Sequence, residues 1–274
     1  MGVGSRVTAV IPTLGRSPWL IPCLEALRRE GVEIVVVDQS EQPLDLPLAD
    51  QVIRPGKNLG FAAGTNLGIG ASFREYVATV NDDALVEPGW TARLVEELDR
   101  HPKAAAAQGI TLSMDGLVDG CGIEWNRWGQ AVQVGHGKPV PSLSEPREVW
   151  GVSATAAIYR RAALGETPFD PRLVSYYEDV DLAGRLRADG WSALLVPAAR
   201  ARHAGSATGG TMSRERWRLV YGNRWLVARS QPFWRMAVRD LLDLGCALGS
   251  GDLARAAGIP AGWLRAARLR KAGT

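Results

Sequence analysis

Carboxylate side chains stand where predicted strands end or a predicted helix begins. Asp38 ends one apolar run, the triplet Asn81–Asp83 follows another, and Glu178–Asp181 opens a helical pattern. In an α/β sheet, the loops that leave the carboxyl ends of parallel strands share one crevice. Carboxylates gathered there, in a chain of net charge +3, indicate a divalent cation and a diphosphate rather than a solvated acidic face.

Each of these groups also has a structural interpretation. Asp38 could accept a hydrogen bond from the ring N–H of a nucleobase, or it could be a turn residue. One of Asp82 and Asp83 could hold Mg²⁺ or Mn²⁺, which prefer oxygen ligands, or the triplet could be an Asx turn. The Glu178–Asp181 segment could supply a general base, but carboxylates also favour a helix N-terminus.

Two further segments could take part in the same chemistry. Residues 58–68 are glycine-rich and open a helix, so their N–H groups could approach a phosphate, or they could form an ordinary strand-to-helix turn. They match neither the dinucleotide-binding nor the P-loop pattern. His203 follows a predicted strand and could complete a metal shell. It opens a Gly- and Ser-rich segment, ending at Gly210, that could form a lid.

The elements that must position these residues follow the order of an α/β domain. A chain of 274 residues is long enough for one such domain with an appendage. Continuously apolar strands favour a mostly parallel sheet that helices cover on both faces. We predict strands over residues 7–11, 33–37, 51–53, 76–80, 104–110 and 193–196, an apolar run over 154–159, and short strands and loops over 116–150. We predict helices over residues 18–29, 88–100, 178–189, 212–230 and 233–248, a loop entering a helix over 60–73, and a weaker helix from residue 252.

Charge is distributed unevenly along the chain. Residues 212–274 carry 12 Arg and Lys against 4 Asp and Glu, so their net charge is +8 and the remainder of the chain carries −5. A basic segment that also contains Trp could rest on an anionic membrane surface, pack on the domain or form a homodimer. It has no recognised nucleic-acid-binding motif, so we expect no nucleic-acid partner.

The cysteines and the N-terminus bear on location. Cys23, Cys121 and Cys246 are scattered and odd in number, and we expect them to be small buried residues in a reducing cytoplasm. The first apolar run meets Pro12 too early for a signal-peptide core, and no run approaches the ~20 residues of a membrane span. We therefore expect a cytoplasmic protein, with peripheral contact at the inner face of the membrane as an option.

The order of these motifs resembles the family 2 glycosyltransferases of GT-A fold, in particular their rhamnosyltransferase- and galactofuranosyltransferase-like branch. The resemblance covers about residues 6–230 and is carried by Val10-Ile11-Pro12-Thr13, Val35-Val36-Val37-Asp38, Asn58-Leu59-Gly60-Phe61 with Gly64 and Asn66, Asn81-Asp82-Asp83 before Pro88-Gly89-Trp90, Glu178-Asp179-Val180-Asp181, and His203. It implies a catalytic domain over residues 1–211, with a nucleotide-sugar half over 1–110 and an acceptor half over 111–211, and a basic helical extension over 212–274.

The resemblance also implies a role for individual residues. Asp179 would be the catalytic base, and Asp83 and His203 would hold Mn²⁺ or Mg²⁺. The site of the nucleotide-sugar donor would include Pro12, Thr13, Asp38, Asn58, Gly60, Asn66, Asn81 and Asp82. The acceptor side would include Trp150, Gly151 and Glu178.

The implied reaction is inverting transfer of a hexosyl or deoxyhexosyl group from a nucleoside-diphosphate sugar to a hydroxyl of a glycan, a lipid-linked saccharide or a natural product. Asn81 replaces the first Asp of a D-x-D motif, and the tail is shorter than in polymerising members, which argues against processive synthesis. Two alternatives stay open: a nucleotidyltransferase on a similar fold, disfavoured by the single glycine of Pro12–Arg16, and a non-catalytic nucleotide-binding protein, disfavoured by the presence of Asp83 and Asp179.

Overall fold

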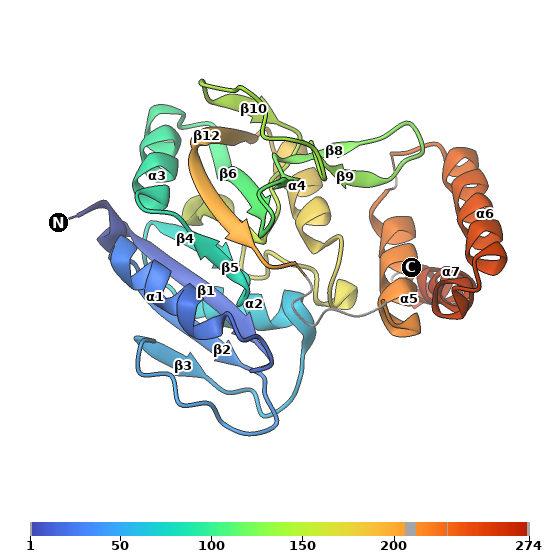
Figure 1. Cartoon of the computed structure of the whole chain (residues 1–274), viewed down its shortest axis with the longest axis horizontal. Coiled ribbons are helices and arrows are strands. Elements are labelled where there is room, and N and C mark those ends of the chain that lie inside the picture. Colours follow the sequence, from blue (N-terminus) through green and yellow to red (C-terminus); the bar gives the residue numbers. More distant parts are fainter. Residues whose placement is uncertain (1, 206–211, 229, 273–274) are drawn as a thin grey trace.

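A computed structural model describes residues 2–205, 212–228 and 230–272. A twisted central sheet carries helices on both faces, and the C-terminal helices pack beside it as a separate group (Figure 1). The helices are α1 (Leu20–Glu30), α2 (Gly60–Gly70), α3 (Trp90–Arg100), α4 (Glu178–Ala188), α5 (Arg214–Val227), α6 (Phe233–Gly249) and α7 (Leu253–Ala272).

The strands form one large sheet and a small hairpin. They are β1 (Val7–Thr13), β2 (Glu33–Asp38), β3 (Gln51–Ile53), β4 (Tyr76–Val80), β5 (Ala84–Val86), β6 (Ala104–Ser113), β7 (Val118–Gly120), β8 (Ile123–Trp125), β9 (Ala131–Gln133), β10 (Arg147–Val149), β11 (Ala156–Arg160) and β12 (Ser192–His203). The large sheet has the order β10-β12-β6-β11-β4-β1-β2-β3, with β5 on β12 and β7 on β6, and β8 pairs with β9.

Most strands of the central path run in one direction, as the sequence predicts. The strands β3, β2, β1 and β4 are parallel, and so are β6 and β12. Strand β11 lies antiparallel between these two groups, so the sheet is mixed. The carboxyl ends of β1, β2, β4 and β12 therefore meet at one edge, and the segment that enters β11 starts from that same edge.

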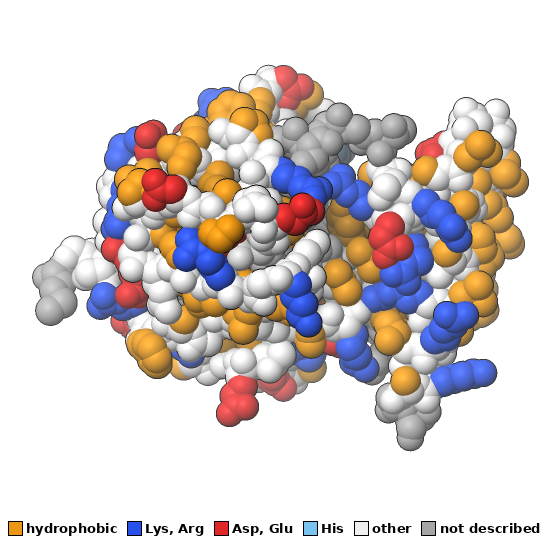
Figure 2. Space-filling view, turned by 90° about the horizontal axis from the view of Figure 1, so that it is seen from below, with side chains coloured by type: hydrophobic (Ala, Val, Ile, Leu, Met, Phe, Trp, Pro, Cys, Tyr) orange, Lys and Arg blue, Asp and Glu red, His pale blue; other side chains and the backbone are white. Residues whose placement is uncertain are grey.

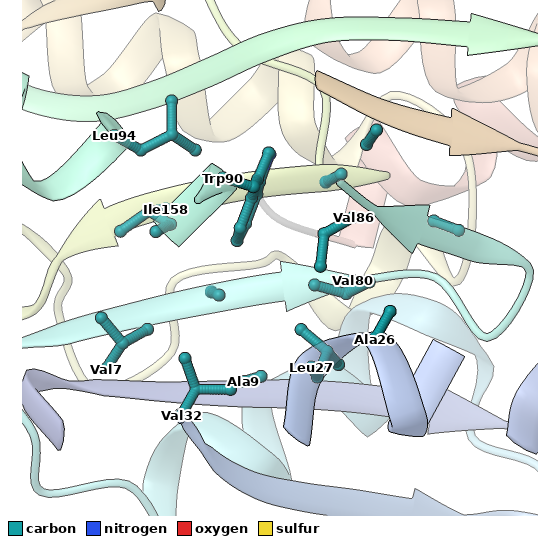
Figure 3. Packing of buried hydrophobic residues seen from close by; sticks show 14 of the residues in the cluster. Val7, Ala9, Ala26, Leu27, Val32, Val80, Val86, Trp90, Leu94 and Ile158 are labelled. Atoms are coloured by element: carbon teal, nitrogen blue, oxygen red, sulfur yellow. The ribbon is translucent and has the colours of Figure 1, made fainter. Parts of the chain in front are cut away.

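Both faces of the sheet are filled by apolar side chains. Helices α1 and α3 cover one face, and α2 and α4 cover the other. On the first face the indole of Trp90 is fully buried and lies beside Val86, Leu94 and Ile158 (Figure 3). The continuous apolar strands of the sequence thus mark burial on both faces.

Several strands extend further than the sequence patterns predict, among them β6, which runs to Ser113. Strand β1 continues through Pro12 to Thr13. The proline is tolerated there because β1 pairs with β4 only as far as Val10, so that Pro12 pairs with β2 alone. Strand β12 resumes beyond an irregular stretch around Pro197 and runs to His203. The histidine therefore ends a strand rather than following one at a distance.

The C-terminal extension is helical, as predicted. The predicted division at residues 211 and 212, and the lid after Gly205, concern residues 206–211, which lie outside the described residues, and both stay predictions. Cys23 and Cys121 are buried as expected, but Cys246 is exposed because it lies on the outward face of α6. Within the described residues, no helix combines the length and the apolar character that a membrane span requires.

Candidate active site

One open cleft of about 1420 Å³ lies against the sheet edge where the strand ends meet. We refer to residues 2–205 as the catalytic body. It contributes the start of α4, the segment before β11 and the hairpin β8–β9 to the cleft, and α5 contributes Val220. The cleft brings together residues that are far apart in the sequence: Asn81, Ser153, Thr155, Glu178, Asp179 and His203.

The two carboxylates that follow β4 point to different partners. Asp82 accepts a hydrogen bond of 2.5 Å from the Thr13 hydroxyl, at the end of β1. Burial and the neighbouring charge of Asp83 raise the pKa of Asp82. Asp83 instead places Oδ1 3.1 Å from Nε2 of His203, at the end of β12. The turn thus separates the two side chains, as expected of adjacent residues.

His203 lies between two carboxylates. Its Nδ1 is 3.0 Å from Oδ2 of Asp119 in β7, while its Nε2 faces Asp83 and lies 3.4 Å from the Asn81 amide. Burial alone would lower the pKa of His203, but its hydrogen bonds with Asp119 and Asp83 raise that pKa to about 9. The imidazole is therefore fixed in orientation by partners on both ring nitrogens.

This donor set fits a divalent cation that is shared with substrate phosphates. No group of three or more His, Cys, Asp or Glu side chains converges within the described residues, so the protein alone supplies few ligands. Octahedral Mg²⁺ binds its ligands at about 2.1 Å, which places neighbouring ligands about 3 Å apart, and Oδ1 of Asp83 and Nε2 of His203 are 3.1 Å apart. Asp119 supplies the outer carboxylate that metal-binding histidines commonly have.

Asp119 provides a first testable prediction. Replacing it by Asn is expected to weaken Mn²⁺ binding in the presence of a nucleoside diphosphate by about 10–100-fold, because the imidazole loses the carboxylate that orients it. Calorimetric titration measures this directly. Asp115→Asn, an exposed carboxylate of the neighbouring turn, removes the same charge and should change nothing. Equal Mn²⁺ affinity in wild type and Asp119→Asn would rule out this role.

Glu178 and Asp179 open α4 against the cleft. Asp179 accepts hydrogen bonds from the N–H groups of Val180, at 2.8 Å, and Ala154, at 3.3 Å, and from the Ser153 hydroxyl. Burial raises the pKa of Asp179, and burial with the adjacent charge of Asp179 raises the pKa of Glu178. Glu178 has a buried Oε2 without a hydrogen-bond partner. An aspartate held in this way suits a proton acceptor.

The loop that leads into Asp179 has an unusual backbone. Val174, Tyr176 and Tyr177 have φ values of 66°, 70° and 69°, which side chains other than glycine rarely adopt. Asn223 of α5 is fully buried, and its amide nitrogen lies 2.7–2.9 Å from the carbonyl oxygens of Leu173, Ser175 and Tyr176. These hydrogen bonds hold the strained loop.

Helix α7 in turn holds Asn223. Arg265 donates one hydrogen bond to the Asn223 carbonyl oxygen and another to the carbonyl of Arg172. The helices approach closely where Gly222 and Gly262 meet, since a Cβ atom on Gly262 would lie 2.7 Å from the Gly222 nitrogen. The C-terminal extension thus reaches the segment that positions Asp179. We refer to Asn223 and Arg265 as the loop clamp.

The glycine-rich segment forms a helix start that packs on the same loop. Asn58 accepts a hydrogen bond of 2.8 Å from the Gly60 N–H, and Gln39 accepts one of 2.8 Å from Leu59 N–H. Gly60 has φ +83°, and a Cβ atom there would lie 2.5 Å from Val174. Glycine is therefore required at this position both by its dihedral angle and by the close approach.

Several predicted site residues have structural partners. Asp38 accepts hydrogen bonds from Ser40, Leu44 and Arg54; burial would raise its pKa, but these bonds lower it. The Asn66 amide bonds to the backbone N–H and C=O of Phe169, rather than facing the cleft. Their predicted nucleotide-binding roles stay predictions, and a ligand at Asp38 would have to share its oxygens with the donors of the chain.

The three residues predicted for the acceptor side lie in different places. Glu178 lines the cleft, but Trp150 stacks edge-to-face on Trp125, with ring centroids 5.4 Å apart, and lines a separate cavity. Gly151 forms a β-bridge with Ile123 and packs on α4, where a Cβ atom would meet Ala183 at 2.6 Å. Residues 153–155, which follow Trp150 and Gly151 in the same stretch, line the cleft.

Sequence reasoning missed the partners that hold the site together. Asp119 lies 84 residues from His203 in a short strand without a motif, and no local pattern predicts their pairing. No local pattern predicts the contacts of Asn223 either, because its partners lie 47–50 residues away in the sequence. A polar side chain on the buried face of the predicted helix 212–230 was the one available signal for Asn223.

The sequence of the chain is similar to that of one known family. The sequence model of the family described as "Glycosyl transferase family 2" matches residues 8–167. The N-acetylglucosaminyl-diphospho-decaprenol L-rhamnosyltransferase of Mycobacterium tuberculosis (strain ATCC 25618 / H37Rv) is 26% identical over 253 residues, which cover 81% of this chain and 79% of that protein.

Solved structures share the fold. Mannosyltransferase PcManGT from Pyrobaculum calidifontis, in complex with GDP-Man and Mn²⁺, matches with a TM-score of 0.57 and 16% identity over 96% of this chain and 86% of that chain. GalNAc-T7 with UDP, GalNAc and Mn²⁺ matches with a TM-score of 0.56 and 16% identity over 72% of this chain, which spans only 42% of that longer chain. The predicted GT-A fold is therefore confirmed. The chain belongs to family 2 of the glycosyltransferases, in its rhamnosyltransferase-like branch.

Proposed function

We propose that this glycosyltransferase moves a sugar from a nucleoside-diphosphate donor to a hydroxyl acceptor, with inversion at the anomeric carbon and with the help of Mn²⁺ or Mg²⁺. The observation that carries the proposal is the cleft itself. It is lined by both Asp179 and His203, and His203 contacts Asp83. In this proposal Asp179 is the proton acceptor, and His203 with Asp83 forms the cation site, at one open cleft.

In this mechanism Asp179 takes the proton from the acceptor hydroxyl as that oxygen attacks the anomeric carbon. The hydrogen bonds from Val180 and Ala154 N–H fix the carboxylate in place. Asp83 and His203 would hold the cation, which when bound neutralises the charge that develops on the departing diphosphate. Asp82 accepts a hydrogen bond from the Thr13 hydroxyl and so joins the ends of β4 and β1.

The name of one relative suggests candidate substrates. A deoxyhexosyl donor such as a nucleoside-diphospho-rhamnose is the first candidate, because the relative from Mycobacterium tuberculosis is named as an L-rhamnosyltransferase. The diphospho-decaprenol in that name makes a lipid-linked saccharide the first candidate acceptor. Cytoplasmic location, peripheral membrane contact and a homodimer stay predictions from composition.

A donor screen tests the reaction. Purified protein is incubated with Mn²⁺ and a panel of nucleoside-diphosphate sugars, and the released nucleoside diphosphate is measured. Its release supports glycosyl transfer, whereas release of pyrophosphate would support the alternative of a nucleotidyltransferase. Absence of either product with every donor would favour a non-catalytic binding protein. The anomeric configuration of the product, read by NMR, decides between inversion and retention.

The cation site is tested by Asp83→Ala. We expect nucleoside-diphosphate binding to lose its dependence on Mn²⁺, because a carboxylate ligand is removed and diphosphate oxygens bind best with the cation present. Titration calorimetry with and without Mn²⁺ measures the effect. Asp45→Asn, an exposed carboxylate in the same half of the protein, is the matched control. An Mn²⁺ effect that survives in Asp83→Ala would remove Asp83 from the cation site.

A further inference from the structure

Helix α6 turns its apolar side chains outward. Trp234, Val238, Leu241 and Leu248 recur at helical spacing and are 41–61% exposed, far above the values of core residues. Together with their neighbours they form one apolar surface, which we call the leucine face. It consists of Phe233, Trp234, Val238, Leu241, Leu242 and Leu248 of α6, with Leu253 and Leu264 of α7.

The opposite side of α6 turns carboxylates inward. Asp240 is fully buried, contacts Arg224, and accepts hydrogen bonds of 2.7 Å from the indole N–H groups of Trp225 and Trp263. Asp243 is 2% exposed and pairs with Arg239 and with Arg255 of α7. In a water-facing helix the apolar residues are buried and the charged ones are exposed. Helix α6 departs from this arrangement, because its carboxylates are buried beside Met236 and Ala247 while its large apolar side chains are exposed. Its outer face is therefore better matched to an apolar medium than to water.

Positive charge flanks the leucine face. Arg235, Arg268 and Arg270 are exposed on α6 and α7, and the carboxylates of residues 230–272 are buried except Asp252, which is partly buried and accepts a hydrogen bond from Arg255 N–H. Figure 2 shows hydrophobic side chains along the outer edge of the C-terminal helices, with Lys and Arg beside them. An apolar strip bordered by cations matches the acyl and headgroup regions of an anionic bilayer.

A groove adds to this match. An open groove with a volume of about 350 Å³ lies between α5, α6 and α7, and two members of the leucine face, Phe233 and Leu241, form part of its wall. The rest of the wall is mainly aromatic and small apolar residues, with Arg270 as its charged member. The groove suits the acyl or isoprenyl chain of a lipid whose phosphate group lies near Arg270.

We propose that the leucine face docks the protein on the surface of an anionic phospholipid bilayer, with α6 and α7 lying in the interface. The inference goes beyond the sugar-transfer reaction and does not depend on it, because lipid binding is measured without any sugar donor. Docking would bring the cleft, which α5 lines through Val220, next to acceptors that are carried by lipids.

Vesicle binding tests the docking. The full chain is sedimented with vesicles of phosphatidylcholine alone or mixed equally with phosphatidylglycerol, and we expect binding only to the anionic mixture, weakened by salt. Trp234→Ser combined with Leu242→Ser should lower binding by about tenfold or more, since both side chains leave the apolar layer. Arg235→Gln and Arg268→Gln should each lower it by about fivefold. Phe73→Ser, which removes an aromatic residue that is 90% exposed on the catalytic body, should leave binding unchanged.

Cys246 gives a second measurement. It is exposed on α6 while Cys23 and Cys121 are buried, so an environment-sensitive dye attached to native protein reports on the leucine face. A blue shift of its emission on anionic vesicles is expected. Absence of binding to anionic vesicles, or equal binding by wild type and the Trp234/Leu242 variant, would overturn the proposal. It would also be overturned by a lipid-free homodimer that the same variant converts to monomers, because the face would then be a protein interface.

Discussion

Replacing Asp179 by Asn is expected to lower turnover by about 10²–10⁴-fold, the usual contribution of a general base. The amide has nearly the shape of the carboxylate and can still accept a hydrogen bond from Val180 or Ala154 N–H. It cannot take a proton from the acceptor hydroxyl. Binding of the nucleoside diphosphate, measured by calorimetry, should be unchanged because the predicted donor site lies at the strand ends.

Stability and pH dependence separate this effect from unfolding. Burial raises the pKa of Asp179, so its ionised form destabilises the fold as the pH rises through that pKa. The Asn variant should therefore melt at or above the wild-type temperature at neutral pH. Wild-type activity should fall as the pH drops through the same raised pKa, and the residual activity of the variant should lack this acid limb.

The control for Asp179→Asn lies on the same helix turn. Asp181 pairs with Arg185 at 2.9 Å and lines a different cavity from Asp179. Asp181→Asn removes the same charge at a cost of only a few tenths of a kcal/mol, and activity should stay near the wild-type value. Full transfer activity in Asp179→Asn, or an equal loss in Asp181→Asn, would disprove the assignment of the base.

Replacing Asn223 by Ala is expected to lower turnover by about 10²-fold without changing nucleoside-diphosphate affinity. The variant leaves the carbonyl groups of Leu173, Ser175 and Tyr176 without their donor. The strained loop can then relax, and a displacement of about 1 Å at Asp179 suffices for a loss of that size. Stability should fall by roughly 2–4 kcal/mol, since buried carbonyl groups lose their hydrogen bonds.

If Asn223→Ala lowers turnover but leaves donor affinity unchanged, the residue positions the catalytic loop. If both fall together, the substitution has destabilised the fold as a whole. Asn223→Asp keeps the volume but offers acceptors where the loop needs donors, so it should be at least as impaired as the Ala variant. Glu215→Gln changes an exposed residue of the same helix, paired with Arg218, and serves as control. Wild-type turnover in Asn223→Ala with a lowered unfolding temperature would limit the loop clamp to a structural role.

The central strands of the sheet could be predicted from local patterns because they are apolar runs bounded by turn residues, whereas the three-residue strands β7 and β10 contain no such run. The antiparallel placement of β11 could not be predicted, since the run Ala156–Arg160 has the same composition whether its neighbours are parallel or antiparallel. The prediction for β12 ended too early, at Val196, for a different reason. Proline normally ends a strand, and only the partner strand shows that pairing resumes at Arg200.

The positions of candidate site residues in the fold were predictable where adjacent residues form a motif at a strand or helix end, and the roles of these residues stay predictions. Asp83, Asp179 and His203 stand where the order of motifs implies. Their supporting partners, Asp119 and Asn223, each stand alone in segments without a motif. Hydrogen-bond partners that meet only in the folded chain leave no local pattern, and these two residues illustrate that limit.

The loop clamp also bears on when the protein becomes active during its synthesis. All strands of the central sheet end by His203, so the catalytic body can assemble once that residue has left the ribosome. The segment before Asp179 must wait longer, because Arg265 contacts Arg172 across 93 residues of chain. A nascent chain at this stage would have a complete sheet, but the loop before Asp179 would still lack its contacts with Arg265. We expect a product that is truncated before α7 to retain the sheet but to transfer sugar more slowly than the full chain, because Arg265 is then missing from the loop clamp.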